Sequence, residues 1–91
     1  MIVKVKKKHI QLGERKSCYH CPIALAVKDA LKCHIVDVTT LGISVQMTKD
    51  DDYIQYRATN KVKNFVLNYD DFENPKPMQF RLIRKKKNAF S

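Results

Sequence analysis

CYHCPIALA, residues 18–26, is the stretch that decides the fold of this chain, because a helix begins within it. Pro22 suits the first helical position, where its missing N–H is not needed and its φ is already helical. After Pro22, apolar residues recur at spacings of three and four as far as Leu31. This spacing predicts an amphipathic helix over residues 22–33, with a pair of thiols directly before it.

The chain before this helix predicts a strand and one helical turn. Lys4 and Lys6 alternate with valines, which is typical of a strand with one face in water, at about residues 2–6. Residues 7–12 contain further apolar side chains and stop at Gly13, which predicts a single helical turn. A glycine in this place predicts a left-handed residue that closes the turn.

The chain after the helix predicts three strands, a second helix and a last strand. Two β-branched runs, residues 35–40 and 43–47, flank a Leu-Gly pair and predict a hairpin. Residues 53–57 predict the next strand of an antiparallel meander. From Asn60, the expected N-cap, apolar residues fall at i, i+3, i+4 and i+7 and predict the second helix. Alternation over residues 78–82 predicts the last strand.

Together these elements predict an α+β fold in the order β-α-β-β-β-α-β. We expect one small antiparallel or mixed sheet of about five strands packed with two helices. A single domain is expected over residues 1–83, with a basic and flexible C-terminal tail over residues 84–91. The predicted core comes from both helices and the last strand: Ile23, Leu25, Ala26, Val27, Leu31, Phe65, Val66, Tyr69 and Phe80.

The composition indicates a basic binding protein. The 91 residues include 18 Lys and Arg against 9 Asp and Glu, a formal net charge of +9. Such an excess creates a positive field that attracts polyanions, so nucleic acid is the expected partner and an acidic protein the alternative. A chain this short buries a modest share of its surface, and it has no glycine-rich phosphate loop. We therefore expect a binding protein and not an enzyme.

The basic residues gather at the two ends of the chain. If the first and last strands pair, both clusters join one surface able to meet phosphates, with Lys4, Lys6 and Arg81 pointing outward. Tyr53 and Tyr56 could add stacking on unpaired bases, or could pack across strands. The predicted nucleic-acid-binding residues are Lys4, Lys6, Lys7, Lys8, Arg57, Arg81, Arg84, Lys85, Lys86 and Lys87.

The thiol pair Cys18-x-x-Cys21 has the spacing of half a zinc site, which His20, Cys33 and His34 could in principle complete. Cys33 cannot join from the far end of the same helix, about 18 Å away at a rise of about 1.5 Å per residue, because zinc–sulfur bonds are about 2.3 Å long. His9 or a second copy of the chain could supply the missing ligands. No metal or other cofactor is expected, and Cys18, His20 and Cys21 are the candidates should one bind.

Two other interpretations of the thiol pair need no metal. A helix N-terminus stabilises a thiolate, so the pair could be a dithiol redox site. However, a polar loop and not a strand precedes it. The interpretation we favour is that Cys21 is a small buried residue at a helix cap and that Cys18 has no special role.

Several features predict a soluble protein of a reducing cytoplasm. Three cysteines cannot all pair within one chain. Met1-Ile2-Val3 is followed at once by Lys4, unlike the apolar core of a signal peptide. No apolar run approaches the roughly 20 residues that span a bilayer. We therefore expect free or metal-bound thiols and no membrane partner.

Four motifs resemble those of a group of small uncharacterised bacteriophage proteins. They are His9-Ile10 followed by Gly13, the CPIALA run at 21–26, Phe65-Val66 with Tyr69-Asp70, and Pro77 with Phe80 and Leu82. The similarity covers most of the chain in the same order, and the CPIALA run is its most specific part. It implies a viral accessory protein acting in the cytoplasm of a bacterial host. The group has no established activity, so the resemblance assigns no catalytic or binding residue.

The sequence thus predicts a non-enzymatic phage accessory protein that binds nucleic acid, or a nucleic-acid machine of the host, through its basic face. The alternative is a protein-directed inhibitor of a host enzyme or defence complex, in which an acidic partner surface attracts the positive charge. A zinc or dithiol module at the thiol pair is the third hypothesis.

Overall fold

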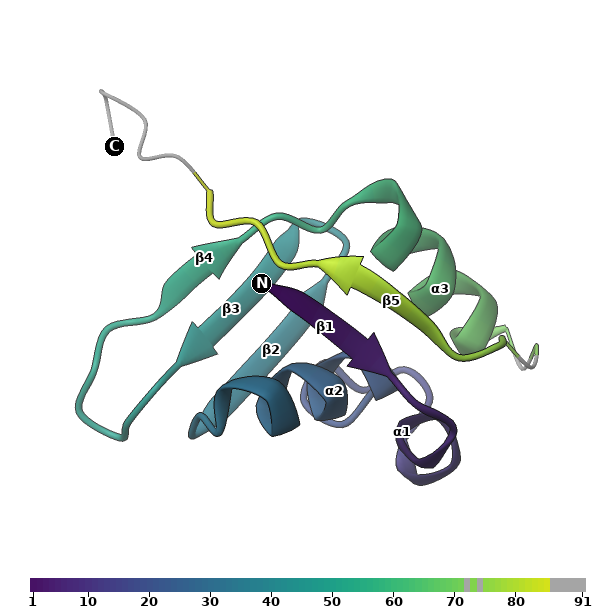
Figure 1. Ribbon diagram of the computed structural model, residues 1–91, viewed down its shortest axis with the longest axis horizontal. Coiled ribbons are helices and arrows are strands. Elements are labelled where there is room, and N and C mark those ends of the chain that lie inside the picture. Colours follow the sequence, from purple (N-terminus) through teal and green to yellow (C-terminus); the bar gives the residue numbers. More distant parts are fainter. Residues whose placement is uncertain (72, 74, 86–91) are drawn as a thin grey trace.

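The computed structural model describes residues 1–71, 73 and 75–85. Three helices and five strands lie within these residues, which confirms the predicted α+β class. In chain order the elements are β1 (Ile2–Val5), α1 (Lys7–Leu12), α2 (Pro22–Leu31), β2 (Ile35–Thr39), β3 (Gly42–Gln46), β4 (Ile54–Tyr56), α3 (Asn60–Asp70) and β5 (Met78–Arg81) (Figure 1).

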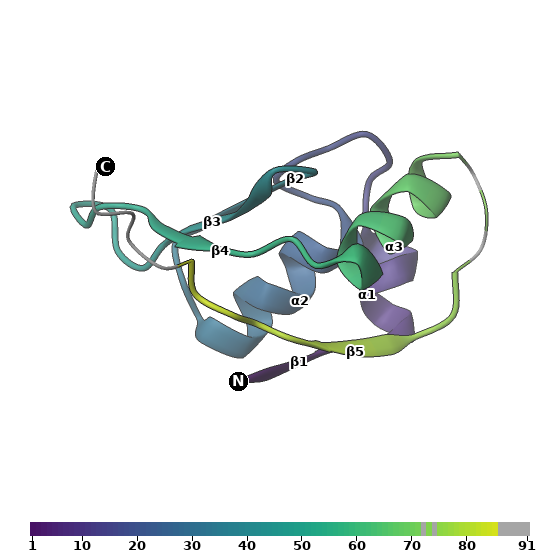
Figure 2. The ribbon, with the colours of Figure 1, turned by 90° about the horizontal axis from the view of Figure 1, so that it is seen from above.

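The five strands form two antiparallel sheets and not one. β1 pairs with β5 in a two-stranded sheet, whereas β2, β3 and β4 form a three-stranded meander. Helix α2 packs against both β1 and β2, so that it lies between the two sheets (Figure 2). This arrangement follows from the helix itself, because its buried residues Ala26, Ile23 and Ala24 are spread over about 160° of its circumference, at about 100° per residue. A helix that is apolar around much of its circumference needs partners on more than one side.

The core combines the buried faces of both sheets with α2 and α3. Six predicted core residues are buried as expected, whereas Leu25, Leu31 and Val66 are half-buried. The prediction missed the inward positions of β1, β2 and β3, which alternate with exposed or half-buried neighbours. These missed core residues are Val3, Val5, Val36, Val38, Ile43 and Val45.

Gly13 is needed for close packing and not for a left-handed turn. Its φ of −68° and ψ of 154° are extended, so the predicted left-handed cap is wrong. A Cβ on Gly13 would lie 2.7 Å from Cδ of Pro22, far inside the normal contact distance. The missing side chain therefore lets the end of α1 approach the start of α2.

The other helix ends differ slightly from prediction. Helix α2 ends at Leu31 and not at residue 33, because Lys32 adopts a left-handed conformation with φ of 52° and its N–H donates to the Lys28 carbonyl. The N-cap of α3 is Thr59, and Asn60 is already helical. None of the described helices is long and apolar enough to cross a membrane.

Tyr69 joins the N-terminal part of the fold to α3. Its hydroxyl donates to the carbonyl oxygen of Gly13 at 2.6 Å, and the carbonyl oxygen of Ile10 is a second acceptor at 3.1 Å. The Arg15 guanidinium lies 4.6 Å from the centre of the Tyr69 ring, and Arg15 Nε donates to the Tyr69 carbonyl oxygen at 2.9 Å. A cation over an aromatic face is attracted by the ring. These contacts hold the loop after α1 against α3.

Two neighbouring apolar residues of α3 provide a test of this core. Phe65 is 6% exposed and Leu67 is 53% exposed. Phe65→Ala should lower the free energy of unfolding by about 3–5 kcal/mol, because it removes a large buried ring and leaves a cavity. Leu67→Ala should change it by less than about 1 kcal/mol, since that side chain already meets water. Urea denaturation measures both, and equal losses would contradict the assigned faces of α3.

Candidate nucleic-acid interface

The pairing of β1 with β5 brings the basic residues from both ends of the chain onto one surface. Lys4 lies opposite Gln79, and Ile2 lies opposite Arg81. All four side chains are exposed, whereas Val3 and its partner Phe80 are buried on the other face. The first and last strands therefore do pair, and Lys4 and Arg81 point outward as expected.

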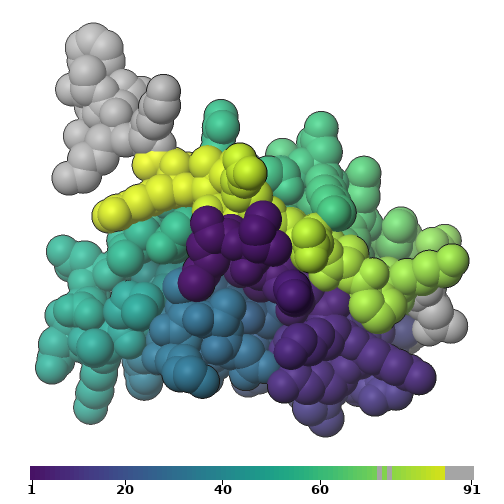
Figure 3. All heavy atoms as spheres, viewed as in Figure 1, coloured from purple at the N-terminus to yellow at the C-terminus, as the bar shows by residue number. Residues whose placement is uncertain are grey.

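A cleft of about 430 Å³ lies where β1, α1 and α2 meet, and we call it the lysine cleft. In Figure 3 the atoms of β1 stand at the centre of the molecule, in dark purple, with α2 in blue below them. Four lysines line the cleft together with one histidine and one carboxylate: Lys4, Lys6, Lys8, Lys32, His9 and Asp29. The cleft thus concentrates positive charge around a hollow and not on a convex surface.

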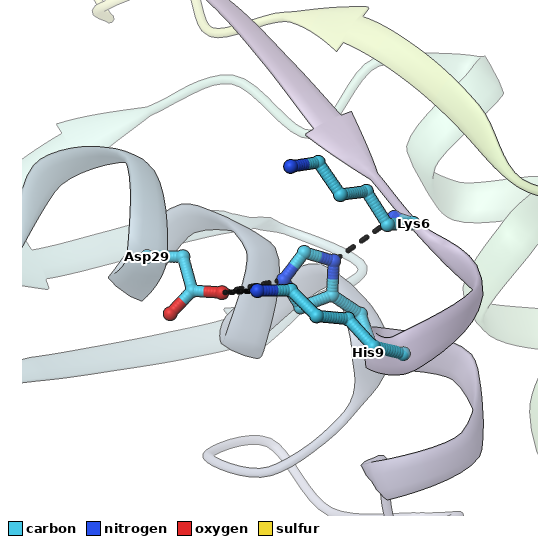
Figure 4. A network of polar contacts seen from close by, with 4 residues as sticks. Lys6, His9 and Asp29 are labelled. Carbon is cyan, nitrogen blue, oxygen red and sulfur yellow. Dashed lines mark hydrogen bonds and ion pairs between the residues drawn. The ribbon is translucent and has the colours of Figure 1, made fainter.

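His9 is held at both ring nitrogens. It is only 4% exposed, and the backbone N–H of Lys6 donates to its Nδ1 at 2.9 Å. Because Nδ1 is an acceptor, the ring proton lies on Nε2, which donates to Oδ2 of Asp29 at 2.7 Å. Figure 4 shows this chain of contacts, with the Lys6 side chain extending from the end of β1 toward α2 on the same side as Asp29.

Asp29 is the exposed end of this chain of hydrogen bonds. Its side chain is 58% exposed, and Lys8 Nζ lies 3.5 Å from the same Oδ2 that His9 contacts. The hydrogen bond from His9, with a smaller effect of the Lys8 charge, holds the pKa of the Asp29 carboxyl below its usual value. Asp29 therefore stays ionised at neutral pH, and its oxygens act only as acceptors.

Lys7 does not line the lysine cleft. With Lys4, Lys6 and Gln79 it lines a separate depression of about 400 Å³ beside the start of β5. Lys4 and Lys6 thus form a ridge between this depression and the lysine cleft. All the N-terminal lysines that the sequence predicted for this surface lie on or beside that ridge.

The other described residues that were predicted to bind nucleic acid lie beside β4 and form what we call the arginine groove. Arg57, Arg84 and Lys85, together with Ile83, line a depression of about 480 Å³. Arg84 pairs with Tyr56 across the strands, and the backbone N–H of Lys85 donates to the Gln55 carbonyl at 3.0 Å. Arg84 and Lys85 therefore lie against β4. Lys86 and Lys87, and the rest of the predicted tail, lie outside the described residues.

The two tyrosines considered for base stacking have different surroundings. Tyr56 lies opposite Ile43 in the sheet and packs against the core, as the cross-strand alternative predicts. Tyr53 precedes β4 and is 46% exposed. Of these two tyrosines, Tyr53 is therefore the more exposed to a ligand.

The two thiols of the CxxC pair have different surroundings. Cys18 is exposed, whereas Cys21 is 2% exposed and is the N-cap of α2, where its Sγ accepts from the Ala24 N–H at 3.5 Å. Burial raises the pKa of the Cys21 thiol to about 11, despite the opposing effect of backbone hydrogen bonds. His20 contacts Ser17 and lies 3.6 Å from Glu14. Within residues 1–71, 73 and 75–85, no three His, Cys, Asp or Glu side chains are placed to hold a metal ion.

Sequence reasoning missed Lys32, Asp29 and the role of His9 in the cleft. Asp29 lies on the side of α2 that the apolar pattern leaves to water, and Lys32 directly follows the helix. That signal was available from the sequence. The meeting of this face with His9 depends on how α1 packs on α2, which is a tertiary contact.

No protein-family model, curated protein or solved structure matches this chain in the three comparisons made.

Thiol reactivity tests the assignment of the three cysteines. At pH 7.5 one thiol, Cys18, should react quickly with Ellman's reagent, because a thiolate is the attacking species and Cys21 stays protonated below a pKa of about 11. Cys33 is also buried and its pKa is also raised by burial. Denaturant should expose all three thiols, and Cys18→Ser should remove the fast phase. Two fast thiols in the native protein would contradict the buried cap.

Proposed function

We propose that this protein binds nucleic acid through the lysine cleft and the basic surface that continues from it, as a non-enzymatic accessory protein of a bacteriophage acting in the bacterial cytoplasm. The observation that carries the proposal is the gathering of four lysines around one hollow. Lysines that surround a concave site hold a phosphate from several directions and raise the local concentration of polyanions.

The basic surface has an extended shape that suits a nucleic-acid backbone. From Gln79 beside Lys4, the chain runs past Arg81 to Arg84 and Lys85 in the arginine groove. This run of six residue steps spans roughly 20 Å at about 3.3 Å per extended residue. Contacts with a phosphate backbone along such a line fix position without reading sequence.

We assign no catalytic step to the lysine cleft. Both ring nitrogens of His9 make hydrogen bonds within the protein, so the ring is not free to exchange a proton with a ligand. A general acid or base must reach the atom whose proton it moves. The contacts of His9 favour a positioning role.

A salt series tests the proposed function directly. The protein should retard short DNA and RNA oligonucleotides in a mobility-shift assay at low salt, and the affinity should fall steeply as salt rises. The variant Lys4→Gln, Lys6→Gln, Lys8→Gln should bind more weakly. Its slope of log affinity against log salt should be shallower, by about 0.7 for each phosphate of a single strand that no longer meets a lysine.

A second triple variant provides the control. Lys49→Gln, Lys63→Gln, Lys76→Gln removes the same charge from residues outside the cleft and should keep most of the salt slope. Equal effects of the two variants would reject the cleft as the site. No binding of oligonucleotides at low salt would reject the proposed function. If the protein instead binds a purified acidic host protein in a fixed ratio, and nuclease does not remove that binding, the protein-directed alternative replaces it.

A further inference from the structure

Asp29 is the one carboxylate among the described residues that line the lysine cleft. A carboxylate repels phosphate, so a surface that only followed a phosphate backbone would bind it better without Asp29. His9 and Lys8 both contact its Oδ2, yet the side chain remains 58% exposed. Asp29 thus offers an acceptor to a ligand in the middle of the positive charge.

The fold holds this acceptor in a fixed position. The buried His9 ring links the backbone N–H at the end of β1 to Asp29 on α2 through two short hydrogen bonds, of 2.9 Å and 2.7 Å. A side chain held in this way loses little further freedom when a ligand binds. An exposed carboxylate on a helix without such an anchor would rotate freely.

An ionised carboxylate beside lysines suits a ligand that carries both phosphate and hydroxyl groups. The hydrogen bond from His9 favours the charged form of Asp29, which can accept a proton donor but cannot donate one. Each internal nucleotide of RNA has one such donor, the 2′-hydroxyl, next to its phosphate, whereas DNA has none. Carboxylates bind ribose hydroxyls in this way in other nucleotide sites.

We propose that the lysine cleft selects ribose over deoxyribose, with the lysines holding phosphate groups and Asp29 accepting a hydrogen bond from the 2′-hydroxyl. The ligand of the proposed nucleic-acid interface is then RNA, so this inference rests on the proposed function. The volume of about 430 Å³ lies within the range of sites that take small ligands, about 300–1,000 Å³. We take the unit bound in the cleft to be one nucleotide of a single strand.

Three oligonucleotides of one sequence test the proposal on the unchanged protein. They are single-stranded RNA, its 2′-fluoro form and the corresponding DNA with deoxyuridine, so the 2′ position is the varied group. Fluorescence anisotropy at fixed salt should give RNA an affinity about tenfold above both others, as expected for one hydrogen bond to a charged acceptor. The 2′-fluoro strand keeps the sugar shape of RNA but has no hydrogen-bond donor. This measurement does not depend on the folding of any variant.

Substitution of the acceptor locates the effect. In Asp29→Ala the affinities for RNA and DNA should become nearly equal, and DNA should bind more tightly than before, because a negative charge has left the cleft. Asp52→Ala removes the same charge from the exposed connection between β3 and β4 and should keep the tenfold preference. Circular-dichroism melting verifies that each variant is folded.

Each outcome separates this inference from the proposed function. Equal binding of all three strands would overturn the selection of ribose and leave the nucleic-acid interface in place. A preference for RNA that persists in folded Asp29→Ala would overturn the role of Asp29. No binding of any strand would overturn both proposals. Binding of adenosine monophosphate without binding of any strand would show that the source of the phosphorylated ribose is a free nucleotide and overturn the assignment to RNA.

Discussion

The pairing of β1 with β5 is the interaction on which the rest of this structure depends. A two-stranded ribbon is marginal by itself, so its stability comes from burying Val3, Val5 and Phe80 against the rest of the core. The same alternation places Lys4 and Arg81 on the opposite face. A slip of one residue would put charges in the core and valines in water, so the burial of the valines also fixes the basic surface.

Helix α2 connects that ribbon to the three-stranded sheet. Its apolar sides meet β1 and β2, and small side chains such as Ala24 and Ala26 allow both to come close. The side that remains carries Asp29 and, just after the helix, Lys32. The helix that completes the core therefore also forms one wall of the lysine cleft, and the cleft cannot form unless the core does.

His9 shows how the polar part of the cleft is tied to the core. Among the described residues, His9 is the side chain that is both polar and buried. Burial of an imidazole is costly unless its ring nitrogens have hydrogen-bond partners. The Lys6 N–H and Asp29 supply both partners, from the end of β1 and from α2. Both hydrogen bonds of the His9 ring form only when β1 and α2 lie at one particular distance. The position of Asp29 at the centre of the basic cleft is therefore fixed by the core.

The sequence by itself determined the elements and the charge. Alternation in β1 and β5, the proline at the start of α2 and the spacing in α3 are local patterns, and all of them predicted the right type of element. The division into two sheets, the packing of Gly13 on Pro22 and the meeting of His9 with Asp29 were decided by tertiary structure. Each of these three features joins residues that are far apart in the sequence, so no local pattern predicts that they meet. The burial of α2 on two sides and the approach of α1 to α2 depend on the packing of the whole chain.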